Sequence, residues 1–264
     1  MPAVYSEFQF CKVDRSDHIL TITINRPEVL NAMNPAAHFE LQEVFDFFAN
    51  DSDMHVAIIT GTGDRAFCVG TDLKELARTN DHRKPPGGFC GITSRFDLYK
   101  PVIAAVNGLC LGGGTEIVAA CDLAIASVHA EFGLVEPRVG LAALGGGALQ
   151  RLAREMPMKD AMMLALTGRR ITAHEALSIS LINQVVPHSD LLSAANALAN
   201  EILLCAPLSV QASKQVMLQG RATPDLKTAI QARYEMAEKM LASQDAIEGP
   251  LAFSQKRKPV WTGK

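Results

Sequence analysis

The stretch that decides the fold is AAVNGLCLGGGTEIVAACD, residues 104–122. It continues a short apolar run, residues 102–106, which has the length and composition of a buried strand. Three glycines, residues 112–114, then open a helix whose first turn holds Glu116. Adjacent glycines let a backbone approach a ligand and leave N–H groups free at a helix start, which suits a developing negative charge. On the glycine spacing alone, however, close packing of the backbone explains these residues better than a ligand site does.

Two neighbouring segments favour a functional interpretation. FCVGTDLKE, residues 67–75, is a second strand-to-helix turn, in which the Thr71 N–H could be another donor. EFGLVEPRVG, residues 131–140, places Glu136 in an apolar setting flanked by glycines. Two carboxylates near two backbone donors equip a site for general acid–base chemistry on a carbonyl compound.

Outward from this centre, alternation and apolar runs predict strands at residues 18–24, 56–60, 123–126 and 182–186. Asn34 and Pro35 start a helix that continues to about residue 49, and a capping box at Thr172 and Glu175 starts another. Residues 190–204, 207–218 and 225–242 are expected to be helical, and residues 80–91 a polar surface loop. The pattern predicts an α/β core over residues 1–195 followed by a helical region over residues 196–264.

Composition excludes several classes of protein. With 48% hydrophobic and 20% charged residues, the 264-residue chain is an ordinary globular protein, and its net charge of −3 provides no basic field for nucleic acid or an anionic membrane. The six scattered cysteines indicate reduced thiols and no metal site. Residues 101–126 are apolar but interrupted by polar residues and glycines, and residues 1–10 lack the pattern of a signal peptide. We therefore expect a cytoplasmic protein without a membrane span.

A dinucleotide-binding fold is a competing interpretation. Residues 61–66 fit the pattern G-x-G-x-x-A after a strand, and Asp81 lies roughly where a ribose-binding acid would be. Such a fold needs a helix directly after the glycines, and none is expected here. A plain turn after a strand explains Gly61 and Gly63 better.

Six ordered blocks resemble the enoyl-CoA hydratase/isomerase (crotonase) superfamily over essentially the whole chain. They are NRPEVLNAM (25–33), ITGTGDRAFCVGTDLKEL (59–76), KPVIAAVNGLCLGGGTEIVAACDLAIAS (100–127), EFGLVEPRVGL (131–141), LTGRRITAHEALSISLINQVVP (166–187) and EGPLAFSQKRKPVW (248–261). The resemblance implies an α/β fold, a crotonase-like spiral of ββα units, with a helical C-terminal region that assembles trimers or hexamers. It implies an acyl-CoA thioester as substrate, with coenzyme A part of that substrate and no separate cofactor.

By motif match, the resemblance places the thioester carbonyl between the N–H groups of Thr71 and Gly113. Family hydratases use two glutamates, which match Glu116 and Glu136, whereas isomerases commonly keep only the acid matching Glu136. Contacts to coenzyme A are expected mainly from backbone at Val29, Val69, Thr71, Asp72, Leu73 and Lys74.

The reaction expected from these residues is reversible addition of water to a trans-2-enoyl-CoA. Burial favours the neutral form of Glu136, while the helix start favours the carboxylate of Glu116, so we expect Glu116 to activate water and Glu136 to protonate C2. The alternatives are an enoyl-CoA isomerase, a dehydratase of an unusual 3-hydroxyacyl-CoA, and a non-catalytic scaffold with the same fold.

Two departures from the family pattern concern the substrate side. Val135 precedes the second glutamate and Pro137 follows it, where hydratases usually have proline before it. LAALGGG, residues 141–147, replaces the turn P-G-x-G-G that helps hold the reacting water, and we expect Gly145 there to matter less than Gly113. None of the seven histidines is expected to be functional.

Overall fold

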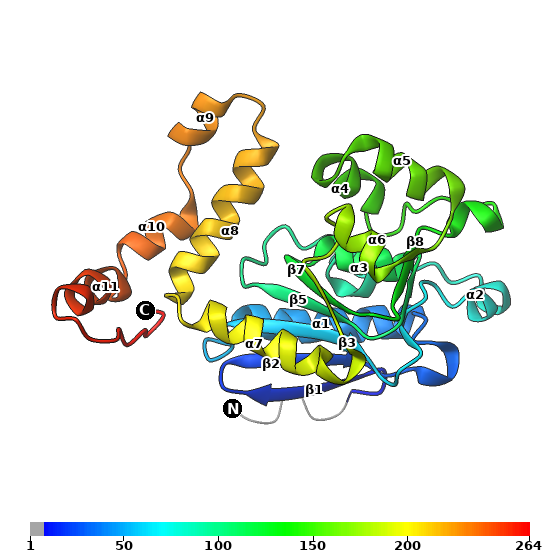
Figure 1. Cartoon of the computed structure of the whole chain (residues 1–264), viewed down its shortest axis with the longest axis horizontal. Helices are drawn as coiled ribbons and strands as arrows, with labels where there is room; N and C mark the ends of the chain where they lie inside the picture. Colours follow the sequence, from blue (N-terminus) through cyan, green and yellow to red (C-terminus); the bar gives the residue numbers. More distant parts are fainter. Residues whose placement is uncertain (1–7) are drawn as a thin grey trace.

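The computed structural model describes residues 8–264, which form two β-sheets surrounded by helices (Figure 1). The larger sheet has the order β1-β2-β3-β5-β7-β10, with β1 antiparallel to β2 and the remaining pairs parallel. Its strands are β1 Cys11–Ser16, β2 Ile19–Ile24, β3 Val56–Gly61, β5 Val102–Val106, β7 Leu123–Ser127 and β10 Gln184–Val186. The predicted strands are confirmed, although the last begins at Gln184 rather than residue 182.

A smaller sheet turns the chain into a spiral. Its strands, in the order β4-β6-β8-β9, are β4 Ala66–Cys68, β6 Leu109–Leu111, β8 Glu131–Gly133 and β9 Ile171–Thr172. Three times, a strand of the larger sheet is followed by one of the smaller sheet and then by a helix, which is α2 Leu73–Thr79, α3 Gly113–Ala120 or α4 Ala148–Glu155. The expected spiral of ββα units is confirmed. Because Gly61 leads into β4 and not into a helix, the dinucleotide-binding interpretation is excluded.

Helices cover both faces of the larger sheet. Helix α1 (Pro35–Asn50) starts where predicted, with the Asn34 side chain accepting from the Ala37 N–H, and buries Leu41 and Phe45 in the main core. Helix α7 (Leu191–Leu203) covers the opposite face, where Ala195 packs in a second core with Ile58 and other strand residues. Helices α5 (Met158–Thr167) and α6 (Ala173–Ser178) complete the core, and α6 has the predicted capping box. Four short 3-10 helices join these elements: η1 Pro27–Val29, η2 Phe89–Gly91, η3 Glu136–Val139 and η4 His188–Asp190.

The C-terminal helices extend away from this core (Figure 1). They are α8 Pro207–Ala222, α9 Leu226–Gln231, α10 Glu235–Leu241 and α11 Asp245–Ser254. The prediction of one helix over residues 225–242 is wrong, because the chain is extended between α9 and α10. There the buried Tyr234 hydroxyl donates to the Ala229 carbonyl, and the side chain of Gln215 accepts from the Met236 N–H. These tertiary bonds replace the helical ones across the break.

The expected boundary between residues 195 and 196 falls inside α7. This helix packs against the larger sheet, so Leu191 is buried and Leu198 and Ile202 contact the second core. Leu192 and Leu204, by contrast, are exposed. Whether residues 1–195 and 196–264 behave as separate domains stays a prediction.

The sequence predicted neither a membrane span nor a signal peptide. Within residues 8–264 no single helix is long and apolar enough to span a membrane. Only the two consecutive helices His188–Leu203 and Pro207–Ala222, taken together, have the length and composition of a span, and they are bent by 99° relative to each other. The signal-peptide prediction concerns residues 1–10, of which residues 1–7 lie outside the described part. All six cysteines lie within it and are free thiols.

Candidate active site

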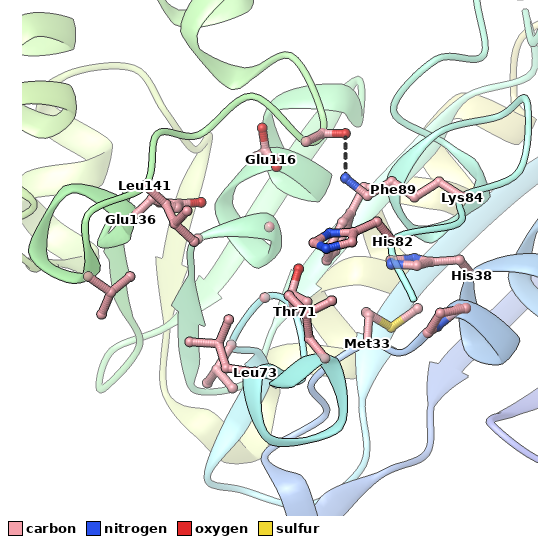
Figure 2. Close-up of a pocket in the computed structure, with 18 of the residues that line it drawn as sticks. Met33, His38, Thr71, Leu73, His82, Lys84, Phe89, Glu116, Glu136 and Leu141 are labelled. Carbon is pink, nitrogen blue, oxygen red and sulfur yellow. Dashed lines mark hydrogen bonds between the residues drawn. The ribbon is translucent and has the colours of Figure 1, made fainter. Parts of the chain in front are cut away.

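A cavity of about 380 Å³ lies where the helices of the ββα units begin (Figure 2). The turns before α2 and α3, the start of α1 and the residues following β8 contribute to its walls. Thr71, Gly113, Glu116 and Glu136 all line it. The topology thus brings together four candidate residues that are far apart in the sequence.

Two backbone turns meet at the cavity. A Cβ atom built on Gly70 would lie 3.1 Å from the Gly113 nitrogen, so the two turns are in contact. The Met33 N–H donates to the Gly70 carbonyl, and the Asp72 N–H donates to the Met33 carbonyl. Because the peptide groups on both sides of Thr71 bond to Met33, the Thr71 N–H points away from Met33. Gly113 is the first residue of α3, where an N–H has no acceptor inside the helix. The two N–H groups are therefore adjacent candidate donors for one oxygen atom.

The glycines of the second turn also serve packing. Gly112 has φ +54° and ψ −123°, which side chains rarely adopt. A Cβ atom on Gly113 would overlap the Phe89 ring, and one on Gly114 would overlap the Cys68 carbonyl. A side chain at Gly113 would thus overlap the Phe89 ring before it could reach a ligand. Close packing therefore requires glycine at all three positions, and approach of a ligand to this turn stays a prediction.

The carboxyl group of Glu116 is held by the turn 141–147. Glu116 is 2% exposed, and its Oε1 accepts from the Gly146 N–H at 2.7 Å and from the Ala148 N–H at 3.4 Å. A Cβ atom on Gly145 would lie 3.2 Å from Glu116 Oε2. The backbone of this turn therefore supports the Glu116 carboxyl group. That Gly145 matters less than Gly113 stays a prediction.

Glu136, the first residue of η3, presents an unsatisfied carboxyl to the cavity. Its Oε2 is buried and, within the described residues, has no hydrogen-bond partner. A Cβ atom on Gly112 would lie 3.0 Å from its Oε1, so the group abuts the glycine turn. Burial raises the pKa of Glu136 above its ordinary value, a backbone hydrogen bond opposes this, and the nearby Glu116 adds to the rise. The group is thus suited to carry a proton.

Of the residues expected to contact coenzyme A, Val69, Thr71 and Leu73 line the cavity, whereas Val29, Asp72 and Lys74 do not. The Asp72 carboxylate caps α2 by accepting from the Glu75 N–H and pairs with Arg26 at 3.2 Å. Because the expected contacts are mainly through backbone, they stay predictions. Within residues 8–264 no three His, Cys, Asp or Glu side chains are grouped as metal ligands would be.

Four residues that line the cavity or support Glu116 were not predicted from the sequence: His38, Lys84, Phe89 and Gly146. The prediction that residues 80–91 form a surface loop is wrong for its second half, since Phe89 and Cys90 are buried. Phe89 packs edge-on against His38, with the ring centroids 4.4 Å apart. Its ring also occupies the space that a side chain at Gly113 would need. One signal was available: His38 lies three residues before Leu41, on the apolar face of its helix.

The fold and the cavity define a crotonase-type protein with paired backbone donors and paired carboxylates. The family model described as enoyl-CoA hydratase/isomerase matches residues 14–264, and the chain belongs to that family.

Relatives and solved structures agree with this assignment. The chain is 42% identical to the carnitinyl-CoA dehydratase of Salmonella arizonae, with 96% of this chain and 98% of the relative covered. It is 41% identical to the carnitinyl-CoA dehydratase of Escherichia coli K12, with 95% and 97% covered. The crystal structure of an enoyl-CoA hydratase from Mycobacterium tuberculosis superposes with a TM-score of 0.90 at 40% identity, covering 97% and 99% of the two chains. The chain is therefore similar to family members named for hydratase or dehydratase activity.

Proposed function

We propose that this protein is a hydro-lyase that interconverts a 2-enoyl-CoA and water with the 3-hydroxyacyl-CoA. The observation that carries the proposal is the placement of two carboxyl groups, Glu116 and Glu136, beside two adjacent backbone donors in one cavity. The two relatives named carnitinyl-CoA dehydratase support the same reaction read in the direction of water loss.

The thioester oxygen would accept from the N–H groups of Thr71 and Gly113, which stabilise the negative charge that forms on it. Glu116, held by the Gly146 N–H, takes a proton from water as its oxygen bonds to C3. Glu136 gives its proton to C2, and the product gains one water. Exchange with solvent then moves the proton from Glu116 back to Glu136. This polar addition changes no net oxidation state, so we propose that no redox cofactor or metal takes part.

The alternatives use the cavity differently. Double-bond isomerisation moves one proton between C2 and C4 and needs one carboxyl group, which leaves the anchored Glu116 without a task. A scaffold protein would need neither the buried, unpartnered Glu136 Oε2 nor the adjacent donors. Both carboxyl groups together favour water addition.

A panel of 2-enoyl, 3-enoyl and 3-hydroxyacyl thioesters of coenzyme A tests the proposal. We expect loss of the enoyl absorbance of the 2-enoyl compounds and a product heavier by one water. Conversion of a 3-enoyl into a 2-enoyl compound without a change in mass would instead establish the isomerase.

A further inference from the structure

One wall of the cavity carries two donors that the proposed mechanism does not use. Figure 2 shows His38, His82, Phe89 and Lys84 together on one side, across from Glu136 and Leu141. The Phe89 ring packs directly on the oxyanion turn at Gly113, contacts His38, and has the Lys84 Nζ 5.6 Å from its centroid. This wall therefore lies beside the thioester carbonyl, within reach of an acyl chain.

His38 is a neutral donor with a fixed tautomer. Its Nδ1 accepts from the Cys90 N–H at 2.9 Å, so in the neutral ring the proton is on Nε2. Cys90 has φ +56°, in the left-handed region, as part of the turn that directs this N–H at the ring. Burial, and to a lesser extent the charge of Lys84, lower the pKa of His38 to about 3, so the ring is uncharged at neutral pH.

The Nε2–H of His38 is free to bind a ligand. Within the described residues it donates to no protein acceptor, and it is not sealed from solvent as Glu136 Oε2 is. His38 is 3% exposed and lines the cavity, so a partner for Nε2 would come from a ligand in the cavity. A buried donor of this kind needs an oxygen atom as its partner.

Lys84 adds positive charge at the same wall. Its Nζ makes one long contact, 3.4 Å, with the Gly145 carbonyl, and no carboxylate in residues 8–264 pairs with it. The one aspartate on this side, Asp81, is already engaged by Arg83 through bonds of 2.7 to 3.1 Å. Glu116 is a further neighbour, because a Cβ atom on Gly145 would lie 2.8 Å from the Lys84 Nζ and 3.2 Å from Glu116 Oε2. Among the described residues, Lys84 therefore has no carboxylate paired with it, although the proposed base lies close by.

These features disfavour a cationic acyl group, such as the quaternary ammonium of a carnitinyl thioester. Quaternary ammonium groups are recognised by cages of aromatic faces. Apart from histidines, Phe89 is the only aromatic residue lining the described cavity, and Lys84 already lies over its ring. The substrate should thus differ in charge from that of the carnitinyl-CoA relatives.

We propose that the cavity takes an acyl group ending in a carboxylate, bound by the Nε2–H of His38 and the ammonium of Lys84. The inference rests on the proposed function, because the thioester must lie at Thr71 and Gly113 for the acyl end to meet this wall. His38 and Lys84 are then the residues that determine specificity among 2-enoyl thioesters.

The test compares three thioesters of coenzyme A with the purified full chain: but-2-enoyl, its derivative with a terminal carboxylate (pent-2-enedioyl), and its 4-trimethylammonio derivative. We expect kcat/KM for the carboxylate compound to exceed that for but-2-enoyl-CoA by about 10-fold to 100-fold, the scale of a charge-assisted hydrogen bond. The cationic compound should be the poorest. Binding of the unreactive saturated analogues, measured by calorimetry, should follow the same order.

A pair of substitutions separates recognition from packing at His38. His38→Asn keeps an acceptor for the Cys90 N–H and removes the donor at Nε2, whereas His38→Gln keeps a donor near Nε2 and loses that acceptor. We expect the Asn variant to lose the preference for the carboxylate compound and the Gln variant to retain most of it. The reverse order would mean that His38 only supports the Cys90 turn, which overturns its role.

Lys84→Met should lower the ratio of kcat/KM values for carboxylate over but-2-enoyl thioester by about 10-fold. Lys159→Met, which removes an exposed lysine outside the cavity, should leave that ratio unchanged. If but-2-enoyl-CoA is hydrated well and the unaltered protein has no preference, or prefers the cationic compound, this inference is wrong and the proposed function stands. If no thioester gains water, both are wrong.

Discussion

Glu116 depends on a residue thirty positions later, because the Gly146 N–H fixes its carboxyl group. Motif spacing was enough to predict the two glutamates and the donors at Thr71 and Gly113 as candidates. It could not predict Gly146 or His38, since their roles arise from contacts between segments distant in sequence. Nor could it predict that the turn 141–147 supports Glu116, because this support comes from a backbone N–H group and does not depend on the identity of a side chain.

Glu116→Gln tests the proposed base. The amide oxygen can still accept from the Gly146 N–H, so we expect the fold and binding of a thioester to persist. Hydration should fall by at least ~10²-fold, the usual scale of general acid–base catalysis. Steady-state kinetics with binding of a saturated thioester as control measures both effects, and turnover close to that of the unaltered protein would rule out the two-glutamate mechanism.

Glu136→Gln tests the proposed acid through stability as well as rate. The pKa of Glu136 is raised in the folded protein, so the folded state binds this proton more tightly than the unfolded state does. The free energy of unfolding therefore falls as the pH rises from the ordinary pKa of the carboxyl group through the raised one. The Gln variant should therefore be more stable than the parent at pH 7. The difference in stability between the two proteins should shrink toward zero below the ordinary carboxyl pKa of about 4.3, where Glu136 is protonated in both the folded and the unfolded state. Urea unfolding at pH 7 and pH 4 measures it, and a variant that is less stable at pH 7 would contradict the buried, unpartnered carboxyl.

At the scale of elements, the long strands and the caps of α1 and α6 followed from apolar runs and capping residues. The smaller sheet did not, because three-residue strands such as Leu109–Leu111 carry too little periodicity to be recognised. The burial of the second half of the loop 80–91 was missed for a similar reason: its glycines and prolines indicate a turn, while the Phe89 ring is buried by partners elsewhere. Local signals thus predicted the scaffold better than the cavity walls.

Gly146→Ala tests the turn as an element of the site. A Cβ atom there would lie 2.8 Å from the Glu116 Cβ, so the turn or the Glu116 side chain must shift, and we expect this to weaken the hydrogen bond from the Gly146 N–H to Oε1. We expect a fall in kcat of about 10-fold to 100-fold, since displacing a catalytic group by a fraction of an ångström is costly. Leu144→Ala, a change at an exposed side chain of the same turn, is the matched control and should retain activity. Equal activity of the two variants would mean that the turn does not position Glu116.

At the scale of the whole molecule, the C-terminal helices leave apolar side chains uncovered. Leu226, Ile230, Leu241, Ile247 and Phe253 are each more than 70% exposed on α9 to α11. An exposed surface of this kind is typical of a contact with another protein chain. The resemblance implied that the helical C-terminal region assembles trimers or hexamers, and the uncovered residues lie in that region.

We therefore predict a homotrimer or a hexamer of two trimers. Sedimentation equilibrium at micromolar concentration should give a mass three or six times that of the chain. Phe253→Asp, at an 87% exposed position, should shift the protein toward smaller species without loss of helix content. A monomeric parent protein under these conditions would refute the assembly.

The central claim is water addition, and reaction in isotopically labelled water tests it most directly. The protein is incubated with but-2-enoyl-CoA, and with its carboxylate derivative, in H₂¹⁸O and separately in D₂O, and the products are examined by mass spectrometry and NMR. We predict a 3-hydroxyacyl-CoA with ¹⁸O on C3 in the first solvent and with one deuterium on C2 in the second. A product of unchanged heavy-atom composition, with deuterium exchanged at C2 or C4 and no ¹⁸O, would contradict the account.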